Sequence, residues 1–235
     1  MIDESCLVKA PTPSATTLLL RQCSSGFDVL LLKKNVKLNY GGTWVFPGGR
    51  IDEGDFVGCT NDALQAARRA AVRETYEEAG LVISEEKLVW FSHWTTPVIR
   101  PRRFSTWFFV APYELGDVQI DGGEIHDHVW ISPLAALEAH KIGEIKLSPP
   151  VFVTLTQLNT FSSMSDVIAV TENERTTHFA PRVNKVPTGE CHLYQGDSGY
   201  ETSQPECDDR RHRLWVNQTG TWVYEQGEVI NENGC

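Results

Sequence analysis

The chain of 235 residues is 41% hydrophobic and carries a formal net charge of −10, with a pI near 5.2. This length can build one large core, or one domain with a long extension. The acidic balance argues against a nucleic-acid backbone or an anionic membrane as the main partner, because both require a positive footprint. An acidic small molecule is compatible with this composition wherever basic residues gather locally.

The cysteines and the N-terminus indicate a cytoplasmic protein. No Cys-x-x-Cys pair occurs, so the sequence predicts neither a zinc ribbon nor a thioredoxin-like motif, and reduced thiols are the simpler interpretation. The N-terminus is acidic and lacks the layout of a signal peptide, and no apolar run approaches the ~20 residues that span a bilayer. The cysteines are Cys6, Cys23, Cys59, Cys191, Cys207 and Cys235.

The N-terminal part of the chain predicts three strands. Residues 16 to 22 and 28 to 34 are apolar runs joined by a short polar turn, which is typical of a strand pair. A third strand over 43 to 46 ends at Pro47-Gly48-Gly49, where glycine lets a ligand approach the backbone closely.

An alanine-rich helix is predicted from about Asn61 to Ala79. Either Asn61 or Asp62 can cap its N-terminus, and Gly80 ends it. A face of small side chains would let this helix pack close to a sheet. That face consists of Ala63, Ala66, Ala67, Ala70 and Ala71.

The next segments predict two strands, over 88 to 94 and 104 to 111, on either side of a loop that carries three arginines. A strand over 128 to 131 then leads through Ser132-Pro133 into a helix over 134 to 140, with the serine as its cap. Another helix is expected over 148 to 161.

Beyond about residue 165 the composition shifts to Thr, Asn, Gly and Asp. Residues 212 to 216 and 221 to 224 predict a hairpin whose turn is supplied by Asn and Gly. We therefore expect a main domain over 1 to 165 and a β-rich C-terminal extension over 166 to 235, packed on the same body. Many strands with two or three helices fit an α+β sandwich.

The most informative segment is the run from Arg73 to Leu81, Arg-Glu-Thr-Tyr-Glu-Glu-Ala-Gly-Leu. At offsets of three and four residues, Glu74, Glu77 and Glu78 share one helix face, where like charges repel. Charge runs on helices are usually solvated faces, but hard cations such as Mg2+ bind one or two carboxylates plus substrate phosphate oxygens. The spacing therefore favours half of a metal site that cleaves a phosphate linkage.

Together with the Gly-Gly turn after the third strand, this run resembles the Nudix box of the Nudix hydrolases. The family's pattern is Gly, five residues, Glu, seven residues, and then Arg-Glu-apolar-x-Glu-Glu-x-Gly-apolar. Asp55 stands where a glutamate is usual, Thr75 replaces an apolar residue, and the spacer over 56 to 72 is ten residues longer than in the pattern. The matching residues are Gly49, Arg73, Glu74, Glu77, Glu78, Gly80 and Leu81.

The resemblance implies a Nudix-type α/β/α sandwich with a mixed sheet, and a metal-dependent hydrolase that cleaves a diphosphate linkage in a nucleoside diphosphate derivative by water attack on phosphorus. It assigns Mg2+ or Mn2+ to Glu77, Glu78 and the backbone carbonyl of Gly48. Glu74 is then a metal ligand or the base that activates water. Arg73 holds the carboxylates in place by charge-assisted hydrogen bonds, unless it is a simple i,i+4 partner of Glu77.

Residues outside the helix are candidates with open alternatives. Asp55 takes part in catalysis or belongs to a polar turn. Glu124 resembles the family's carboxylate before a tryptophan-containing strand, in competition with Asp127 and with a role as loop surface. His126 and His128 alternate on one strand face, which suits zinc, but no further ligand set accompanies them, so ordinary strand histidines are the simpler interpretation.

The loop arginines Arg100, Arg102 and Arg103 either clamp substrate phosphates, since arginine favours bidentate phosphate contacts, or form a solvated basic loop. Short strings beyond the box resemble the coenzyme A diphosphatase-like branch of the family, which makes coenzyme A or its esters one candidate substrate. The expected partner is a small nucleotide-type molecule, without nucleic acid or membrane, and a homodimer is a further possibility. A Nudix-fold module that binds a nucleotide without cleaving it is the alternative function; such modules usually lose box carboxylates, and all three are present here.

Overall fold

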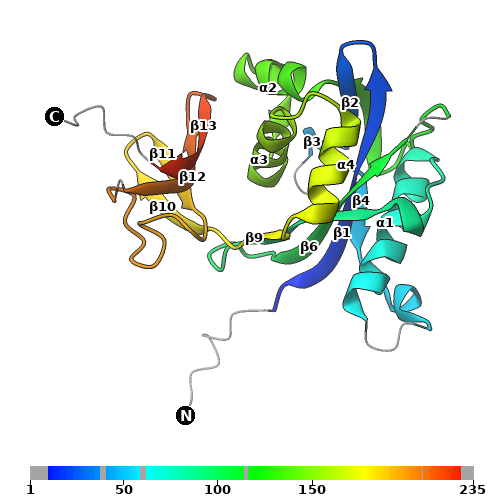
Figure 1. Ribbon diagram of the computed structural model, residues 1–235, viewed down its shortest axis with the longest axis horizontal. Helices are drawn as coiled ribbons and strands as arrows, with labels where there is room; N and C mark the ends of the chain where they lie inside the picture. The colour runs from blue at the N-terminus through cyan, green and yellow to red at the C-terminus, as the bar shows by residue number, and fades with distance from the viewer. Residues whose placement is uncertain (1–9, 38–40, 59–61, 114–115, 208, 229–235) are drawn as a thin grey trace.

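The computed structural model describes residues 10–37, 41–58, 62–113, 116–207 and 209–228. Its strands form two sheets, and most of its helices pack beside the larger one (Figure 1). Four residues named above lie outside the described ranges: Cys6, Cys59, Asn61 and Cys235. The described cysteines are free thiols, as expected, and are Cys23, Cys191 and Cys207.

The larger sheet runs in the order β8-β3-β2-β1-β6-β5-β9, with β4 also paired to β1 and β7 also paired to β2. Parallel pairing joins β1 to β6, β3 to β8 and β5 to β9, so the sheet is mixed, as expected. The strands are β1 (Thr12–Cys23), β2 (Gly26–Lys34), β3 (Thr43–Val45), β4 (Gly48–Arg50), β5 (Val89–Thr95), β6 (Phe104–Pro112), β7 (Ile125–Ile131), β8 (Lys146–Leu147) and β9 (Thr177–Phe179).

The first two strands form the predicted hairpin. β1 and β2 pair antiparallel from Leu20 with Val29 to Cys23 with Gly26. The backbone of Gly26 has a φ of 127°, a conformation that residues with a side chain rarely adopt. The leucines at the centre of both strands are fully buried because both faces of the sheet are covered.

The long helix α1 (Ala63–Ala79) confirms the predicted helix and its limits. The Asp62 side chain caps it by accepting the N–H groups of Leu64 and Gln65 at 3.0 and 3.1 Å. Gly80 ends it with a φ of 69°, and its N–H donates to the carbonyl of Tyr76. Because α1 begins ten residues before Arg73, most of the unusual spacer forms extra helical turns.

Three shorter helices follow, α2 (Pro133–Lys141), α3 (Pro149–Leu158) and α4 (Met164–Asn173). The hydroxyl of Ser132 accepts the N–H of Ala135 at 3.2 Å, which confirms the predicted cap of α2. The structure ends α3 at Leu158, three residues before the predicted limit. Helix α4 was absent from the sequence-based expectations.

The helices cover the two faces of the larger sheet (Figure 1). On one face, the buried alanines of α1 pack in a core with Leu19, Leu30 and Phe109. On the other face, residues of α2, α3 and α4 share a core with Leu18, Leu20 and other side chains of β1 and β2. Alternate leucines of one strand thus face opposite layers. This is the α/β/α sandwich expected from the sequence.

A smaller antiparallel sheet follows, in the order β10-β11-β12-β13. Its last two strands form the predicted hairpin, with Trp215 opposite Val223. The smaller sheet packs on the larger one, since Tyr194 joins the core with Trp94 and Phe179, the latter two rings stacked at 4.0 Å. The division at residue 165 stays a prediction. The strands are β10 (Arg182–Val186), β11 (Gly189–Leu193), β12 (Arg210–Asn217) and β13 (Trp222–Glu228).

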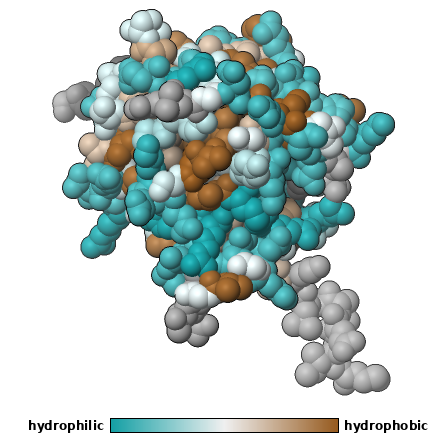
Figure 2. Space-filling model, turned by 90° about the vertical axis from the view of Figure 1, so that its right-hand side faces the viewer, coloured by the Kyte–Doolittle hydropathy of each residue, from teal (hydrophilic) through white to brown (hydrophobic). Residues whose placement is uncertain are grey.

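The face formed by α1 and its neighbouring loops is mostly hydrophilic and carries separate apolar patches (Figure 2). Large exposed apolar side chains of this part of the chain include Val57, Tyr76 and Val82. None of the described helices is long and apolar enough to cross a membrane.

Candidate active site

The short strand β4 places the two glycines of the predicted box against α1. β4 pairs with β1 antiparallel, with Gly48 opposite Thr16 and Gly49 opposite Ala15. A Cβ atom at Gly48 would overlap the backbone of β1, and one at Gly49 would overlap the Glu74 carboxylate. Gly48 therefore needs glycine for steric reasons, whereas a side chain at Gly49 would have to displace the Glu74 carboxylate.

Arg73 lies at the centre of an acidic cluster. Its guanidinium donates to Asp55 Oδ2 at 2.9 Å, to Glu74 Oε1 at 2.8 Å and to Glu77 Oε2 at 3.0 Å. It also donates to the backbone carbonyl of Arg50, at the end of β4, at 2.9 Å. The hydrogen bonds with Asp55, and then those with Glu74, raise the pKa of Arg73. Arg73 is therefore more than an i,i+4 partner of Glu77, because it ties the helix to the loop that follows the glycines.

Asp55 reaches the helix despite being shorter than glutamate. It lies in the single turn η2 (Glu53–Phe56), is 6% exposed, and binds Arg73 through both of its oxygens. One oxygen also accepts the N–H of Asp52 at 2.9 Å, which closes the turn. Asp55 thus belongs to a polar turn, as one interpretation predicted, and it also contacts Arg73. Whether Asp55 takes part in the reaction stays a prediction.

Glu78 is the most buried of the three glutamates, at 5% exposure, and one of its oxygens accepts the amide N–H of Gly48 at 2.8 Å. Burial raises the pKa of Glu78 to about 8, against the opposing effects of the Gly48 hydrogen bond and the positive charge of Lys34. The nearby charges of Glu74 and Glu124 raise it further. An ionised Glu78 would therefore be stabilised by a cation at this position.

Glu74 is also largely buried, and burial raises its pKa above the ordinary value, although Arg73 opposes this shift. The neighbouring departure from the family pattern, Thr75, has a structural explanation. Its fully buried hydroxyl donates to the carbonyl of Ala71 at 2.7 Å and lies 3.2 Å from the hydroxyl of Thr17, from which it can accept. A polar residue can occupy this apolar position because its hydrogen bonds are satisfied.

The loop before β7 brings Glu124 to the cluster. The side chain of Asp121 accepts the N–H groups of Glu124 and Ile125, at 2.8 and 2.9 Å, and so shapes this loop. The Glu124 side chain is exposed and lies near enough to Glu78 for its charge to raise the pKa of that residue. Its competitor Asp127 instead accepts the N–H of His128 at 2.9 Å.

The histidines His126 and His128 are exposed on β7. Among the described residues, no group of three or more His, Cys, Asp or Glu side chains is arranged to hold a metal ion. In particular, Glu74 and Glu77 both contact Arg73. The donor set nevertheless fits a hard divalent cation, because several carboxylates meet one guanidinium and the buried Glu78 carboxylate lies against backbone. Glu77 is 53% exposed, so it can exchange Arg73 for a cation by rotation of its side chain.

The three loop arginines lie in different environments. Arg100 forms an ion pair with Glu190 of the smaller sheet, at 2.7 Å. Arg103 donates from Nε to the carbonyl of Thr96 at 3.1 Å, within its own loop, and Arg102 is exposed. A contact between these arginines and a substrate phosphate stays a prediction.

Lys34 is a candidate residue that the sequence interpretation missed. It lies at the end of β2 opposite Ile125, and its charge acts on Glu78. The doublet Lys33-Lys34 at a strand end was the available signal. Its significance depends on the pairing of β2 with β7, which local patterns do not reveal.

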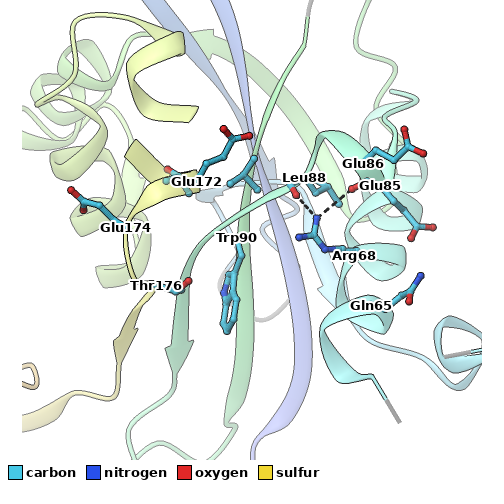
Figure 3. A pocket seen from close by; sticks show the side chains of 11 residues that line it. Gln65, Arg68, Glu85, Glu86, Leu88, Trp90, Glu172, Glu174 and Thr176 are labelled. Atoms are coloured by element: carbon cyan, nitrogen blue, oxygen red, sulfur yellow. Dashed lines mark hydrogen bonds between the residues drawn. The ribbon is translucent and has the colours of Figure 1, made fainter. Parts of the chain in front are cut away.

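A cavity of about 660 Å³ lies elsewhere, between the N-terminal half of α1, β5 and α4 (Figure 3). Arg68 in this cavity donates to the carbonyls of Leu88 and Glu85, and the lining also includes Trp90 of β5 and two acidic residues at the end of α4, Glu172 and Glu174 (Figure 3). Glu74, Glu77 and Glu78 do not line it. The glutamate cluster is therefore a candidate site separate from this cavity.

Comparison with known proteins points to the same family as the resemblance of the glutamate helix. The NUDIX domain model matches residues 11–149. The chain is 23% identical to the acyl-coenzyme A diphosphatase NUDT19 of Xenopus laevis, covering 87% of this chain and 79% of that protein. It is 33% identical to the protein of the same name from Gallus gallus, over 60% of this chain and 40% of that one. A NUDIX hydrolase crystal structure from Alicyclobacillus acidocaldarius matches with a TM-score of 0.63 at 20% identity, over 68% of this chain and 96% of that chain.

The family match spans β1 to β8, the glycine turn and the glutamate helix. The likeness to the solved structure supports the sandwich fold. The chain therefore belongs to the NUDIX domain family and is a Nudix-type pyrophosphohydrolase, as the resemblance of its glutamate helix predicted.

Proposed function

We propose that this chain hydrolyses the diphosphate linkage of coenzyme A or its acyl esters with the help of Mg2+ or Mn2+. The observation that carries the proposal is the position of Glu78, a buried carboxylate held against the Gly48 amide in a cluster where acidic groups outnumber Arg73. A cation offsets this excess of negative charge, and a diphosphate brings further oxygens to share it.

Glu74, Glu77 and Glu78, with the backbone carbonyl of Gly48, would hold the metal. When bound, such an ion neutralises charge on the diphosphate and lowers the pKa of water. Glu74 has a pKa raised by burial, which suits a group that orients water and accepts its proton. Arg73 fixes the direction of Glu74 through a hydrogen bond, and it holds Glu77 in the same way until Glu77 turns to the metal.

Two basic residues are suited to the substrate's phosphates. Lys34 lies beside Glu78, and its ammonium can contact a phosphate oxygen on the β2 side of the site. Arg102 is exposed in the loop between β5 and β6. The similarity to two acyl-coenzyme A diphosphatases supports this substrate class, and it extends over 87% of this chain for one of them.

The test is a substrate panel with Mg2+ and with Mn2+, comprising coenzyme A, a medium-chain acyl-coenzyme A, ADP-ribose, NADH and a dinucleoside tetraphosphate. We expect coenzyme A or its ester to give the highest kcat/KM, with release of an adenosine bisphosphate. Glu78→Gln should lower kcat by at least about 100-fold, because it removes a group that acts on charge in the transition state.

Glu86→Gln is the matched control, since Glu86 is exposed and lies at the remote cavity. Its activity should equal that of the wild type. Equal activity in Glu78→Gln would overturn the site assignment. A clear preference for another member of the panel would overturn the substrate class but not the hydrolysis.

A further inference from the structure

The smaller sheet reaches back to the loop between β5 and β6. Glu190 of β11 accepts a hydrogen bond from Arg100, 2.7 Å away, on the same oxygen that contacts His192 Nε2 at 2.9 Å. Although burial opposes it, the hydrogen bond with His192 and the charge of Arg100 hold the pKa of Glu190 below its ordinary value. The carboxylate is therefore ionised at neutral pH and acts as an acceptor for both partners.

His192 makes this contact more rigid than an ordinary surface ion pair. Its ring is buried, at 4% exposure, and burial lowers its pKa, so the imidazole is neutral at neutral pH. Since an ionised carboxylate only accepts hydrogen bonds, Nε2 carries the proton and donates it to Glu190. The buried ring of His192 thus orients the Glu190 side chain, which restricts its rotation and directs its oxygen towards Arg100.

The base of the same loop is fixed to the smaller sheet's core. Trp94, just before the loop, is 4% exposed and contacts the ring of Tyr194 edge to face at 5.7 Å. The loop itself is closed by Thr96, whose hydroxyl accepts the N–H of Phe104 at 3.0 Å. Its tip carries exposed apolar side chains, Val98 and Ile99, beside Arg100. The Glu190 contact therefore holds the tip of a loop whose base is already fixed.

This loop returns to the sheet one strand away from the catalytic glycines. The carbonyl of Arg103 accepts the N–H of Thr12 at one edge of β1, while Ile51 donates to Pro13 at the other edge. Strand spacing of roughly 4.8 Å puts β6 and β4 about 10 Å apart across β1. An extended coenzyme A molecule is longer than this separation between β4 and β6.

We infer that Glu190 is a positioning residue that fixes the loop over residues 96 to 103 for contact with the part of the substrate beyond the diphosphate. The inference rests on the proposed function for the substrate itself. The loop offers apolar side chains and guanidinium groups together, which suits an anionic molecule with an apolar arm. In this arrangement, the smaller sheet contributes to substrate binding through Arg100 without contacting the reacting atoms.

The experiment compares Glu190→Gln with Glu201→Gln. Glu201 pairs with Arg182 in the same sheet at 3.0 Å and is 80% exposed, so it matches the charge change away from the loop. Hydrogen exchange of peptides covering 96 to 103 needs no substrate and should be faster in Glu190→Gln only. With coenzyme A or its ester, KM should rise about two- to fivefold in that variant while kcat stays within about twofold, the range of one exposed ion pair.

Glu190→Asp keeps a carboxylate acceptor for Arg100 and His192, so its exchange rate and KM should lie closer to those of the wild type than those of Glu190→Gln do. Unchanged exchange in Glu190→Gln would overturn the contact as a constraint on the loop. Faster exchange with an unchanged KM would overturn its role in substrate binding. A wild type without turnover on any coenzyme A derivative would overturn the proposed hydrolysis instead, while the exchange rates would still decide on the Glu190 contact.

Discussion

Two arginines differ in how much negative charge surrounds them: Arg213 in the smaller sheet and Arg73 in the helix that packs on the larger sheet. Arg213 of β12 is 1% exposed and pairs with the equally buried Asp197, at 2.7 and 2.9 Å from two nitrogens. It also donates to the backbone carbonyls of Pro205 and Cys207. One positive charge meets one negative charge, and the remaining donors contact backbone oxygens. This centre holds the loop that precedes β12.

Arg73, in contrast, meets more acid than it can neutralise. It contacts Asp55, Glu74 and Glu77, and Glu78 lies on the same helix face. The cluster is also partly exposed, with 28% of the Arg73 side chain accessible. A balanced buried pair is complete in the free protein, whereas an acidic excess at a partly open surface can be relieved by protonation or by a bound cation. The first arrangement stabilises the fold and the second indicates a binding site.

The largest expected effect comes from breaking the balanced centre. Arg213→Met leaves the Asp197 carboxylate buried without its partner, which should lower the free energy of unfolding by about 3–5 kcal/mol. Urea denaturation measures this change. Arg182→Met, in the exposed pair with Glu201, should cost less than about 1 kcal/mol. Similar losses in the two variants would remove the distinction between a buried and an exposed centre.

Neutralising the unbalanced cluster should act in the opposite direction. Glu78→Gln removes a carboxyl group whose ionisation burial disfavours, so the metal-free protein at neutral pH should gain on the order of 1–3 kcal/mol in unfolding free energy. Adding Mg2+ should raise the melting temperature of the wild type and leave that of the variant unchanged. Thermal denaturation with EDTA and with Mg2+ measures both effects. A variant less stable than the metal-free wild type would contradict the idea of an acidic excess.

Asp55 tests whether Arg73 must be fixed from the loop side. Asp55→Asn keeps the side-chain size but loses one of two acceptors for Arg73, and we expect kcat/KM to fall about tenfold. Asp55→Glu, the residue usual at this position in the family pattern, should retain most of the activity. The matched control is Asp52→Asn, because Asp52 is 67% exposed and lies 3.8 Å from Arg73. If both variants lose kcat/KM equally, the loss in Asp55→Asn reflects a change of surface charge and not the Arg73 contact.

Local patterns predicted most of the larger sheet and the helix that carries the site. The limits of α1 follow from two residues with direct capping roles, Asp62 and Gly80, and the β1–β2 hairpin follows from apolar runs around a short turn. Helix α4 contains Asp, Thr and Asn, and its stability comes from Val167 and Ile168 packing against the sheet. Strand β9 has three residues and exists through pairing with β5. Both depend on tertiary contacts.

The same division applies to the site. The three glutamates were predictable because one helix sets their spacing. Lys34 and Glu124 join them only through the pairing of β2 with β7, and Arg100 meets Glu190 across ninety residues of sequence. The phosphate contact expected for Arg100 was inferred from the type of residue and its loop position. Neither indicates that Arg100 pairs with Glu190 of a distant strand.

The smallest expected effect is the dependence of stability on the protonation of His93, a half-buried residue. His93 of β5 hydrogen bonds through Nε2 with the hydroxyl of Ser105 at 2.8 Å and stacks on His178 at 5.3 Å. Burial, with a smaller effect of His178, lowers the pKa of His93 to about 4. The native state therefore favours the neutral ring. Protonation would place a positive charge in a half-buried position beside Ser105 and His178, neither of which is a carboxylate.

The sign of the pH dependence follows from this depressed pKa. The stability contributed by neutral His93 is present above the ordinary histidine pKa of about 6.5 and is lost as pH falls from there towards 4. His93→Asn should reduce the loss of unfolding free energy between pH 7 and pH 5 by about 1 kcal/mol or less, because the ring is partly exposed and solvent screens its charge. Denaturant titrations at the two pH values measure this difference, with His126→Asn on the exposed face of β7 as control. If both variants keep the full wild-type pH dependence, the acid sensitivity belongs to the other buried histidines, of which His192 and His212 also have a pKa lowered by burial.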